Sequence, residues 1–406
     1  MNFDTEPRTQ HRALHLPTEE TAPASSAGPR AASRINFDQR PLLVFWETTR
    51  ACSLACRHCR ASAQKDPLPG ELDADEGLAL LEQISQFGKP APVLIATGGD
   101  VLMRSDLDAL AARAAGLRLP IALAPSVTPL LTAERAADLR RLGVKVVSVS
   151  LDGATAARHE GIRGVDGHFE ATLRAIRLLR AAGLHVQINT LVMRENAGEL
   201  AAVAEIVARE DAAIWELFFL VCVGRGETLA ELTPDENEDV CNFLADAARY
   251  GFVVRTVEAP FFRRVVAWRA EDPEPHGTGP LYDRLTTDLR NRLGPPTKPA
   301  KAQTKGTRDG KGIVFIGYNG DISPAGFLPF TLGNIRRDRL IDIYRDHPLL
   351  RAIRASRFTG RCGTCEYADL CGGSRARAYA ATGDPLGEDP ACAYTPGTHA
   401  RPTERL

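Results

Sequence analysis

Apolar and β-branched residues occur along the middle of the chain in short runs, separated by longer stretches with helical periodicity. The short runs predict strands at residues 42–47, 93–97, 121–124, 144–151, 186–192 and 216–221. The stretches between them predict helices at residues 75–87, 107–115, 133–142, 169–182, 199–210 and 234–250. Such alternation favours parallel strands joined by right-handed helical crossovers. We therefore expect an α/β fold whose six βα units form a partial (β/α)6 barrel.

The regular alternation ends near residue 251, and composition divides the rest of the chain. Residues 271–311 are rich in Pro, Gly and Lys, which favours a linker with a mobile basic second half; solvated lysines fit it better than a basic lid does. Ordered structure is predicted to return at residue 312. The expected parts are a disordered arm at 1–34, a barrel at 35–260, a linker at 261–311 and a C-terminal domain at 312–406.

Composition narrows the possible partners. The 50 basic and 51 acidic residues balance, so no global charge points to nucleic acid or to an anionic membrane. No apolar run reaches the roughly 18 to 20 residues that a membrane span needs. The first 34 residues are polar and lack the apolar core of a secretion signal. Nine cysteines in such a chain indicate reduced thiols and a cytoplasmic enzyme rather than a disulfide framework.

Three cysteines, Cys52, Cys56 and Cys59, form a CxxxCxxC motif directly after the first predicted strand. Three thiolates can hold three irons of a 4Fe-4S cluster and leave the fourth iron open, because a closed cluster takes four cysteines. A structural zinc site usually has four ligands in two separated pairs, and no fourth cysteine follows within the next hundred residues. Zinc and plain packing are therefore the less favoured interpretations of this motif.

Polar residues follow the predicted strands at their carboxyl ends, where the active sites of such barrels lie. Each signal is weak alone, since a Gly-Gly-Asp loop is most often a simple turn. Together with the three cysteines they indicate a ligand with an amine, a carboxylate, ribose hydroxyls and an adenine. In chain order these residues are Gly98, Gly99, Asp100, Ser150, Asp152, Arg163, Asn189 and the segment 223–226.

Over residues 41–251 the order of these motifs resembles radical S-adenosylmethionine (SAM) enzymes. The resemblance implies that Cys52, Cys56 and Cys59 ligate a 4Fe-4S cluster whose open iron is chelated by the methionine part of S-adenosylmethionine. One electron would then cleave the cofactor to a 5'-deoxyadenosyl radical, which abstracts a hydrogen from the substrate. No catalytic residue is expected beyond the cluster and the cofactor.

The resemblance also assigns roles to the strand-end residues. Gly98, Gly99 and Asp100 would contact the methionine amine, and Arg163 its carboxylate. The remaining three, expected to contact the ribose or the carboxylate, are Ser150, Asp152 and Asn189. The chain departs from the family pattern at two positions: Asp100 replaces the usual Glu, and His58 replaces an aromatic residue before the third cysteine.

A second group of four cysteines lies near the end of the chain. Four thiolates suffice for a closed cluster, although a zinc knuckle fits the same count on chemistry alone. The region 361–392 resembles the auxiliary-cluster domain of the SPASM and Twitch branch, and two further cysteines of that branch are missing. We therefore expect one auxiliary 4Fe-4S cluster in a Twitch-like arrangement. Its expected ligands are Cys362, Cys365, Cys371 and Cys392.

The other polar and sulfur-containing residues that we considered have simpler interpretations. Arg375 and Arg377 precede a helical stretch and fit an exposed surface that complements the helix dipole. Cys222 and Cys241 stand alone and are expected to be packed core thiols.

Two stretches, 45–50 and 371–385, resemble enzymes that modify porphyrin side chains in haem and haem d-type synthesis, and less closely the maturases of ribosomal peptides. The expected substrate is therefore a tetrapyrrole or another small molecule, with a peptide as the alternative. An electron donor such as flavodoxin or ferredoxin would be needed. A hypothesis of another class is a non-enzymatic iron-sulfur electron carrier.

Overall fold

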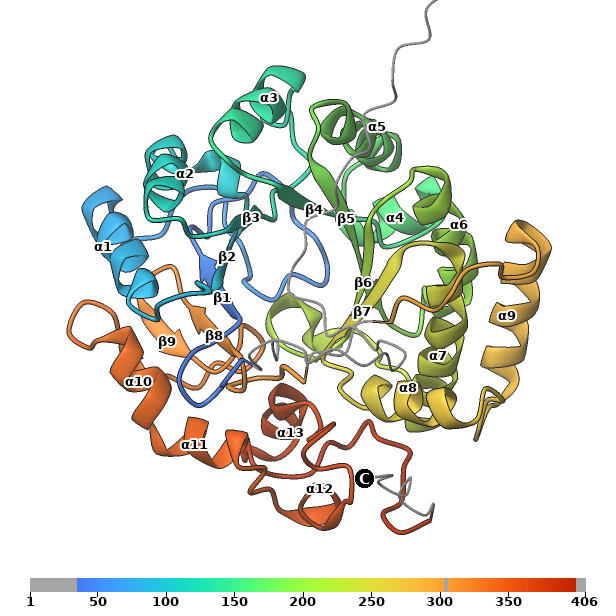
Figure 1. Ribbon diagram of the computed structural model, residues 1–406. Helices are drawn as coiled ribbons and strands as arrows, with labels where there is room; N and C mark the ends of the chain where they lie inside the picture. The colour runs from blue at the N-terminus through green and yellow to red at the C-terminus, as the bar shows by residue number, and fades with distance from the viewer. Residues whose placement is uncertain (1–34, 303–305, 399–406) are drawn as a thin grey trace, which may run out of the picture. The chain divides into compact units, whose positions relative to one another are not determined.

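The computed structural model describes residues 35–302 and 306–398 (Figure 1). The expected arm at 1–34 and Lys305 of the expected linker lie outside these residues. One sheet of ten strands runs through the described chain, in the order β10-β9-β8-β1-β2-β3-β4-β5-β6-β7. The strands are β1 (Leu43–Glu47), β2 (Val93–Thr97), β3 (Ile121–Leu123), β4 (Val146–Ser150), β5 (His185–Val192), β6 (Ile214–Phe219), β7 (Val253–Val257), β8 (Ile313–Ile316), β9 (Asp321–Ser323) and β10 (Gly333–Asn334).

The first six strands are the six that the sequence predicts, and all neighbours from β1 to β7 pair in parallel. The seventh strand, β7, was not predicted. It has five residues, and Arg255 and Thr256 interrupt its apolar run. Its place in the sheet comes from pairing with β6, in which Glu216 stands opposite Arg255.

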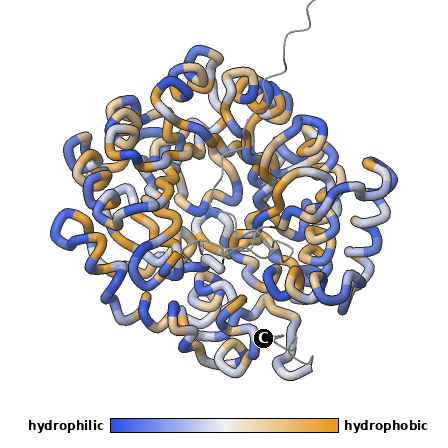
Figure 2. Tube along the Cα trace, viewed as in Figure 1, coloured by the Kyte–Doolittle hydropathy of each residue, from blue (hydrophilic) through white to orange (hydrophobic). Residues whose placement is uncertain are grey.

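Helices cover the outer side of the parallel strands, with apolar residues facing inward and polar ones facing solvent (Figures 1 and 2). Their amphipathic faces explain this arrangement, because burying an apolar stripe against the sheet stabilises each βα unit. In the barrel region they are α1 (Ala74–Ser85), α2 (Leu107–Gly116), α3 (Ala133–Arg141), α4 (Ala156–Arg163), α5 (His168–Ala181), α6 (Leu200–Arg209) and α7 (Pro234–Ala247). Short 3-10 turns lie at Val101–Met103, Ala197–Glu199, Gly224–Thr228 and Ala248–Tyr250.

The expected linker at 261–311 is wrong over most of its first half, which contains two helices, α8 (Phe262–Glu271) and α9 (Pro280–Leu293). Helix α9 buries Leu281, Leu285 and Leu289, spaced four residues apart, and packs on α6 and α7. Its first residue is a proline, which suits the first turn of a helix as well as it suits a loop. The density of Pro and Gly around it concealed this periodicity.

The C-terminal segment continues the barrel sheet. Strand β8 pairs in parallel with β1, and β9 and β10 add antiparallel pairs beyond it. Four short helices follow: α10 (Leu340–Asp346), α11 (Pro348–Arg354), α12 (Gly360–Thr364) and α13 (Arg375–Thr382). The segment therefore closes against the first strand of the barrel rather than standing apart from it.

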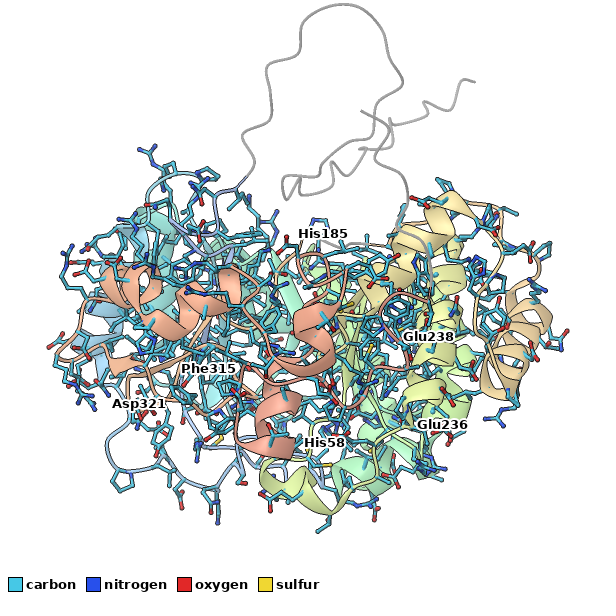
Figure 3. The ribbon with its side chains drawn as sticks, turned by 90° about the horizontal axis from the view of Figure 1, so that it is seen from below. His58, His185, Glu236, Glu238, Phe315 and Asp321 are labelled. Carbon is cyan, nitrogen blue, oxygen red and sulfur yellow. The ribbon has the colours of Figure 1, made fainter. Side chains whose placement is uncertain are left out.

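The parallel strands share one direction, so their carboxyl ends lie on one face. Figure 3 shows His185, the first residue of β5, at one edge and His58, from the cysteine loop after β1, at the other. Residues for chemistry are expected at the edge marked by His58. Within the described residues, no helix is long and apolar enough to cross a membrane.

Candidate active site

A cavity of about 240 Å³ opens at the carboxyl ends of β1 to β6. It brings together all three cysteines of the first motif and six of the seven residues expected to hold the cofactor. These are Cys52, Cys56, Cys59, Gly98, Gly99, Ser150, Asp152, Arg163 and Asn189.

The cysteine loop directs its sulfur atoms toward polar hydrogens. The backbone N–H of Leu54 donates to Cys52 Sγ at 3.4 Å, and that of Ala63 donates to Cys59 Sγ at 3.5 Å. Arg163 Nη1 donates to Cys56 Sγ at 3.5 Å. Donors of this kind favour thiolates, which are the form that binds metal. Burial nevertheless raises the pKa of Cys52, so a proton would leave when metal binds.

Gly98 and Gly99 are required because the cysteine loop packs directly against them. A Cβ at Gly98 would lie 2.4 Å from the Thr49 carbonyl oxygen, and one at Gly99 would lie 2.2 Å from that of Ala51. The N–H of Gly99 donates to Thr49 O at 2.8 Å. Both glycines line the cavity as expected. Because these glycines have no side chain, the cysteine loop can pack against them, and a ligand can approach them equally closely.

Asp100 is the one predicted cofactor residue that does not line the cavity. Its side chain is fully buried and accepts from the N–H of Leu102 and Ser126 and from Thr128 Oγ1 at 2.9 Å. Ser126 in turn lies 3.5 Å from Cys52 Sγ. The expected direct amine contact is therefore corrected: Asp100 positions the loop after β3, which lines the cavity in its place.

Asp152 and Arg163 form a buried ion pair, with 2.6 Å between Oδ2 and Nη2. Burial alone would raise the pKa of Asp152, but the charge of Arg163 and the neighbouring histidines outweigh it, and this pKa is lowered. His58 Nε2 lies 3.8 Å from the same carboxylate, and burial lowers the pKa of His58 to about 4. The site therefore holds a carboxylate, a guanidinium and a neutral imidazole side by side.

Ser150 and Asn189 stand opposite each other on β4 and β5 and face the same cavity. Gln187 Nε2 bridges Asn189 Oδ1 at 2.7 Å and Glu216 Oε2 at 2.8 Å. Burial raises the pKa of Glu216, whereas Arg255 and Gln187 oppose that rise. Through its hydrogen bond to Oδ1, Gln187 fixes the orientation of the Asn189 amide.

Sequence reasoning missed Arg225, which clamps the cysteine loop. Its Nε donates to Cys56 O at 2.9 Å and its Nη1 to Ala63 O at 3.0 Å. The preceding Gly224 has a φ of +58°, and a Cβ there would lie 2.4 Å from Arg60 O. The glycines around Arg225 were the available signal, but they predict a ligand loop rather than this clamp.

A pair of buried histidines was also missed. His159 Nδ1 accepts from the Asp152 N–H at 3.1 Å, so its other nitrogen carries the hydrogen that bonds to His168 Nδ1 at 2.8 Å. His168 Nε2 then donates to Val127 O at 3.1 Å. Burial lowers the pKa of His159 to about 3. The neutral pair thus joins the loops after β3 and β4 behind the cavity.

Four residues that line the cavity carry buried polar atoms without a hydrogen-bond partner in the described chain: His58 Nδ1, Asp152 Oδ2, Arg163 Nε and Arg225 Nη2. Of these atoms, Asp152 Oδ2 has its ion pair with Arg163. Buried donors and acceptors are normally paired, so the other three atoms indicate a polar ligand that completes them. A cluster on three thiols and a cofactor with amine, carboxylate and ribose groups fit this set of residues.

Two of the four distal cysteines, Cys362 and Cys371, lie next to one glycine. Gly373 N–H donates to Cys371 Sγ at 3.5 Å, and a Cβ on Gly373 would lie 3.0 Å from Cys362 Sγ. Burial, followed by the charge of Cys371, raises the pKa of Cys392 to about 12. Cys365 also lies close to Cys362, whose charge adds to burial in raising the pKa of Cys365. Four thiolates can ligate a closed cluster, but among the described residues no three ligand-type side chains form a group that could hold a metal ion as it stands. All nine cysteines of the chain are free thiols.

The expected exposed surface at Arg375 and Arg377 is wrong, because both side chains are buried. Arg377 Nη2 donates to Leu220 O at 2.9 Å and Nη1 to Glu258 O at 2.9 Å. It thereby ties α13 to the ends of β6 and β7. Cys241 is a fully buried core thiol as expected, and Cys222 is half-buried, with its thiol 3.5 Å from Leu229 O.

Two known protein families match parts of this chain. Residues 46–207 match the radical SAM superfamily, and residues 308–366 match SPASM, an iron-sulfur cluster-binding domain. AdoMet-dependent heme synthase of Oleidesulfovibrio alaskensis is 36% identical over 94% of this chain and 95% of its own. The chain belongs to the radical SAM superfamily. It is a radical SAM iron-sulfur enzyme with a C-terminal SPASM domain.

Other radical SAM proteins extend the comparison. AdoMet-dependent heme synthase of Nitratidesulfovibrio vulgaris is 37% identical over 87% of this chain and 92% of its own. Mycofactocin maturase of Mycobacterium ulcerans is 29% identical over 90% of this chain and 91% of the maturase. The solved structure of Streptococcus suis SuiB bound to S-adenosylmethionine has a TM-score of 0.65 at 15% identity, covering 88% of this chain and 78% of that one. At 15% identity, the similarity to SuiB is evidence for the fold alone.

Proposed function

We propose that this radical SAM enzyme modifies a tetrapyrrole, or a similar small molecule with carboxylate side chains. The observation that carries the proposal is the sequence identity of this chain to two enzymes named AdoMet-dependent heme synthase. The identity is 36% over 94% of this chain for one and 37% over 87% for the other. The maturase is less similar, at 29%. The cavity adds support on its far side, where Phe218 and Phe327 lie with ring centroids 6.3 Å apart. Flat aromatic walls suit a flat aromatic substrate.

In this proposal Cys52, Cys56 and Cys59 hold the first cluster, and Arg225 keeps their loop in shape. When bound, the cluster and S-adenosylmethionine supply reductive cleavage of the cofactor and a 5'-deoxyadenosyl radical that takes a hydrogen from the substrate. The proposed cofactor contacts are Gly98, Gly99, Ser150, Asp152, Arg163 and Asn189. The rigid glycine contacts and buried ion pair exclude water and hold the cofactor in one orientation.

The four distal cysteines are proposed to bind one auxiliary 4Fe-4S cluster. Cys371 is buried and the other three thiols are half-buried, and backbone N–H groups donate to Cys362 and Cys371. A flavodoxin or ferredoxin is the proposed electron donor. The free thiols fit a reducing compartment, and we place the enzyme in the cytoplasm.

The test is anaerobic reconstitution with iron and sulfide, followed by dithionite, S-adenosylmethionine and iron coproporphyrin III. Mass analysis should show 5'-deoxyadenosine together with a change in the mass of the porphyrin. Release of 5'-deoxyadenosine with the porphyrin and its metal-free form both unchanged would exclude the tetrapyrrole proposal and favour a peptide. Failure to cleave S-adenosylmethionine at all would support the electron-carrier hypothesis instead.

A further inference from the structure

Two buried arginines near the four distal cysteines have no ion-pair partner within residues 35–302 and 306–398. Arg308 is 4% exposed and Arg375 is fully buried. Their donors go to backbone carbonyls: Arg308 Nη2 to Ile353 O at 2.9 Å, and Arg375 Nη1 to Gly387 O at 2.6 Å. A buried charge without a partner is costly. The positive charge of these two guanidinium groups therefore calls for an anion.

Both guanidinium groups face the cysteines. Arg375 Nη2 lies 3.6 Å from Cys362 Sγ, and Arg308 Nη1 donates to Cys371 O at 3.4 Å. Phe358 lies between them, with its ring centroid 5.1 Å from Arg308 Cζ and 4.4 Å from Arg375 Cζ. The aromatic ring holds the two cations in place against their mutual repulsion.

The Cys371-Gly372-Gly373 sequence leaves room for these two arginines. A Cβ at Gly372 would lie 2.5 Å from Arg308 Nη1, and one at Gly373 would lie 2.5 Å from Arg375 Nη2. Each glycine of the motif is thus matched to one guanidinium group. The two arginines therefore pack closely against the Cys371-Gly372-Gly373 segment.

None of the nearby carboxylates forms an ion pair with either arginine in the described residues, although the charge of Arg375 acts on Asp309 and that of Asp369 on Arg308. Asp389 lies 3.5 Å from Arg377, with which it forms an ion pair. Asp309 accepts from the backbone N–H groups of Arg375 and Ala376, and burial raises its pKa. Burial also raises the pKa of Glu258 well above its usual value, with the charge of Asp309 adding to the rise.

We propose that Arg308 and Arg375 are the counter-cations of the auxiliary cluster and raise its reduction potential. The inference rests on the proposed ligand set Cys362, Cys365, Cys371 and Cys392. One-electron reduction makes a four-thiolate cluster more negative, so a fixed positive charge in a dry site stabilises the reduced form. Hydrogen bonds to the thiolate sulfur act in the same direction, and Arg375 supplies one of them.

The test isolates the auxiliary cluster in a full-length parent carrying Cys52→Ala, Cys56→Ala and Cys59→Ala. After anaerobic reconstitution, its reduction is followed by electron paramagnetic resonance against applied potential. Replacing Arg308 by Gln should leave about tenfold fewer reduced clusters at the parent's midpoint potential. That ratio is expected for one unit charge lost at roughly 10 Å with an effective dielectric constant of about 20. Replacing Arg308 by Lys should restore most of the difference.

Two controls separate charge from general damage. Arg354, a buried arginine of the same segment, also donates to backbone carbonyls and lies over Tyr344, but it has an ion pair with Asp38 at 2.9 Å. Because its charge is already paired, Arg354→Gln should leave the potential unchanged. Gly372→Ala should displace Arg308 and lower the potential. Gly383 has the same left-handed φ of about +75° but open space around it, so Gly383→Ala should not.

Unchanged potentials in both Arg308→Gln and Gly372→Ala, with full cluster content, would overturn the inference and leave the ligand set standing. If Arg308→Gln holds no cluster, Gly372→Ala and Arg308→Lys decide the question through the same titration. A parent without any cluster would refute the four-cysteine ligand set itself, and the inference with it.

Discussion

The two cysteine groups differ in what surrounds their sulfur atoms. The three cysteines of the barrel loop border an open cavity whose lining includes a neutralised Asp152–Arg163 ion pair. The four distal cysteines lie near several buried arginines, two of which, Arg308 and Arg375, have no ion pair in the described chain. The first group leaves a place for an outside ligand, whereas the second is closed by the protein. Location in the fold, more than cysteine count, thus distinguishes the two groups.

The largest expected effect separates the two groups by ligand removal. Cys52→Ala should reduce 5'-deoxyadenosine release to the level seen without enzyme, because three thiolates are the minimum for the open cluster. Cys392→Ala should remove only the iron and sulfide of the auxiliary cluster. Iron analysis and chromatography of the reaction products check both. Full iron content in Cys392→Ala would mean that Cys392 is not a ligand.

A second effect tests the packing beneath the first site. In Gly99→Ala the new Cβ would lie 2.2 Å from Ala51 O, so the cysteine loop must shift. Overpacking of this kind costs about 1–3 kcal/mol of unfolding free energy. Gly116, which has open space around it, provides the matched control for the same substitution. Chemical denaturation measures the cost, and equal stability of the two variants would contradict the close packing.

A third effect depends on pH. The pKa of His159 is about 3 in the fold, below its usual 6.5, so the unfolded chain binds the extra proton first. The stabilisation is therefore complete above pH 6.5 and is lost as the pH falls toward 3. The slope is about 1.4 kcal/mol per pH unit for this one group. His159→Asn keeps an acceptor for the Asp152 N–H and should show a shallower fall in urea-unfolding free energy. Identical slopes would contradict the neutral pair.

The smallest effect is expected at Arg57, which lies between two cysteines in sequence but on the surface in space. Its Nη1 lies 3.3 Å from Glu195 Oε1, and half of its side chain is exposed. Exposed ion pairs contribute less than about 1 kcal/mol. Arg57→Ala should keep its iron content and its melting temperature nearly unchanged. Loss of the first cluster in this variant would show that the loop depends on more than its buried contacts.

The sequence predicts the parts of this molecule that local pattern specifies. The cysteine spacing and the first six strands are read from neighbouring residues, and so are the polar strand ends at Ser150 and Asn189. Strand β7 was not predictable in that way, because its polar residues are paired by β6 only after folding. The pairing of β8 with β1 joins segments about 270 residues apart, and no local pattern encodes it.

The direction in which side chains point is the second feature that the sequence alone did not predict. Asp100 has the residue type of a cofactor contact, but hydrogen bonds to the loop after β3 turn it away from the cavity. Arg375 and Arg377 have the composition of a surface helix, and only the docking of α13 on the ends of β6 and β7 buries Arg377. Arg225 needed the cysteine loop as its partner. In each case the decisive contact comes from a distant part of the chain.

We expect that the three-cysteine site alone binds S-adenosylmethionine. Two reduced proteins would be compared by electron paramagnetic resonance, with and without the cofactor. One keeps only Cys52, Cys56 and Cys59, and the other keeps only the four distal cysteines. S-adenosylmethionine should change the spectrum of the first protein and leave that of the second unaltered. A cofactor-dependent change in the second protein, with none in the first, would contradict it.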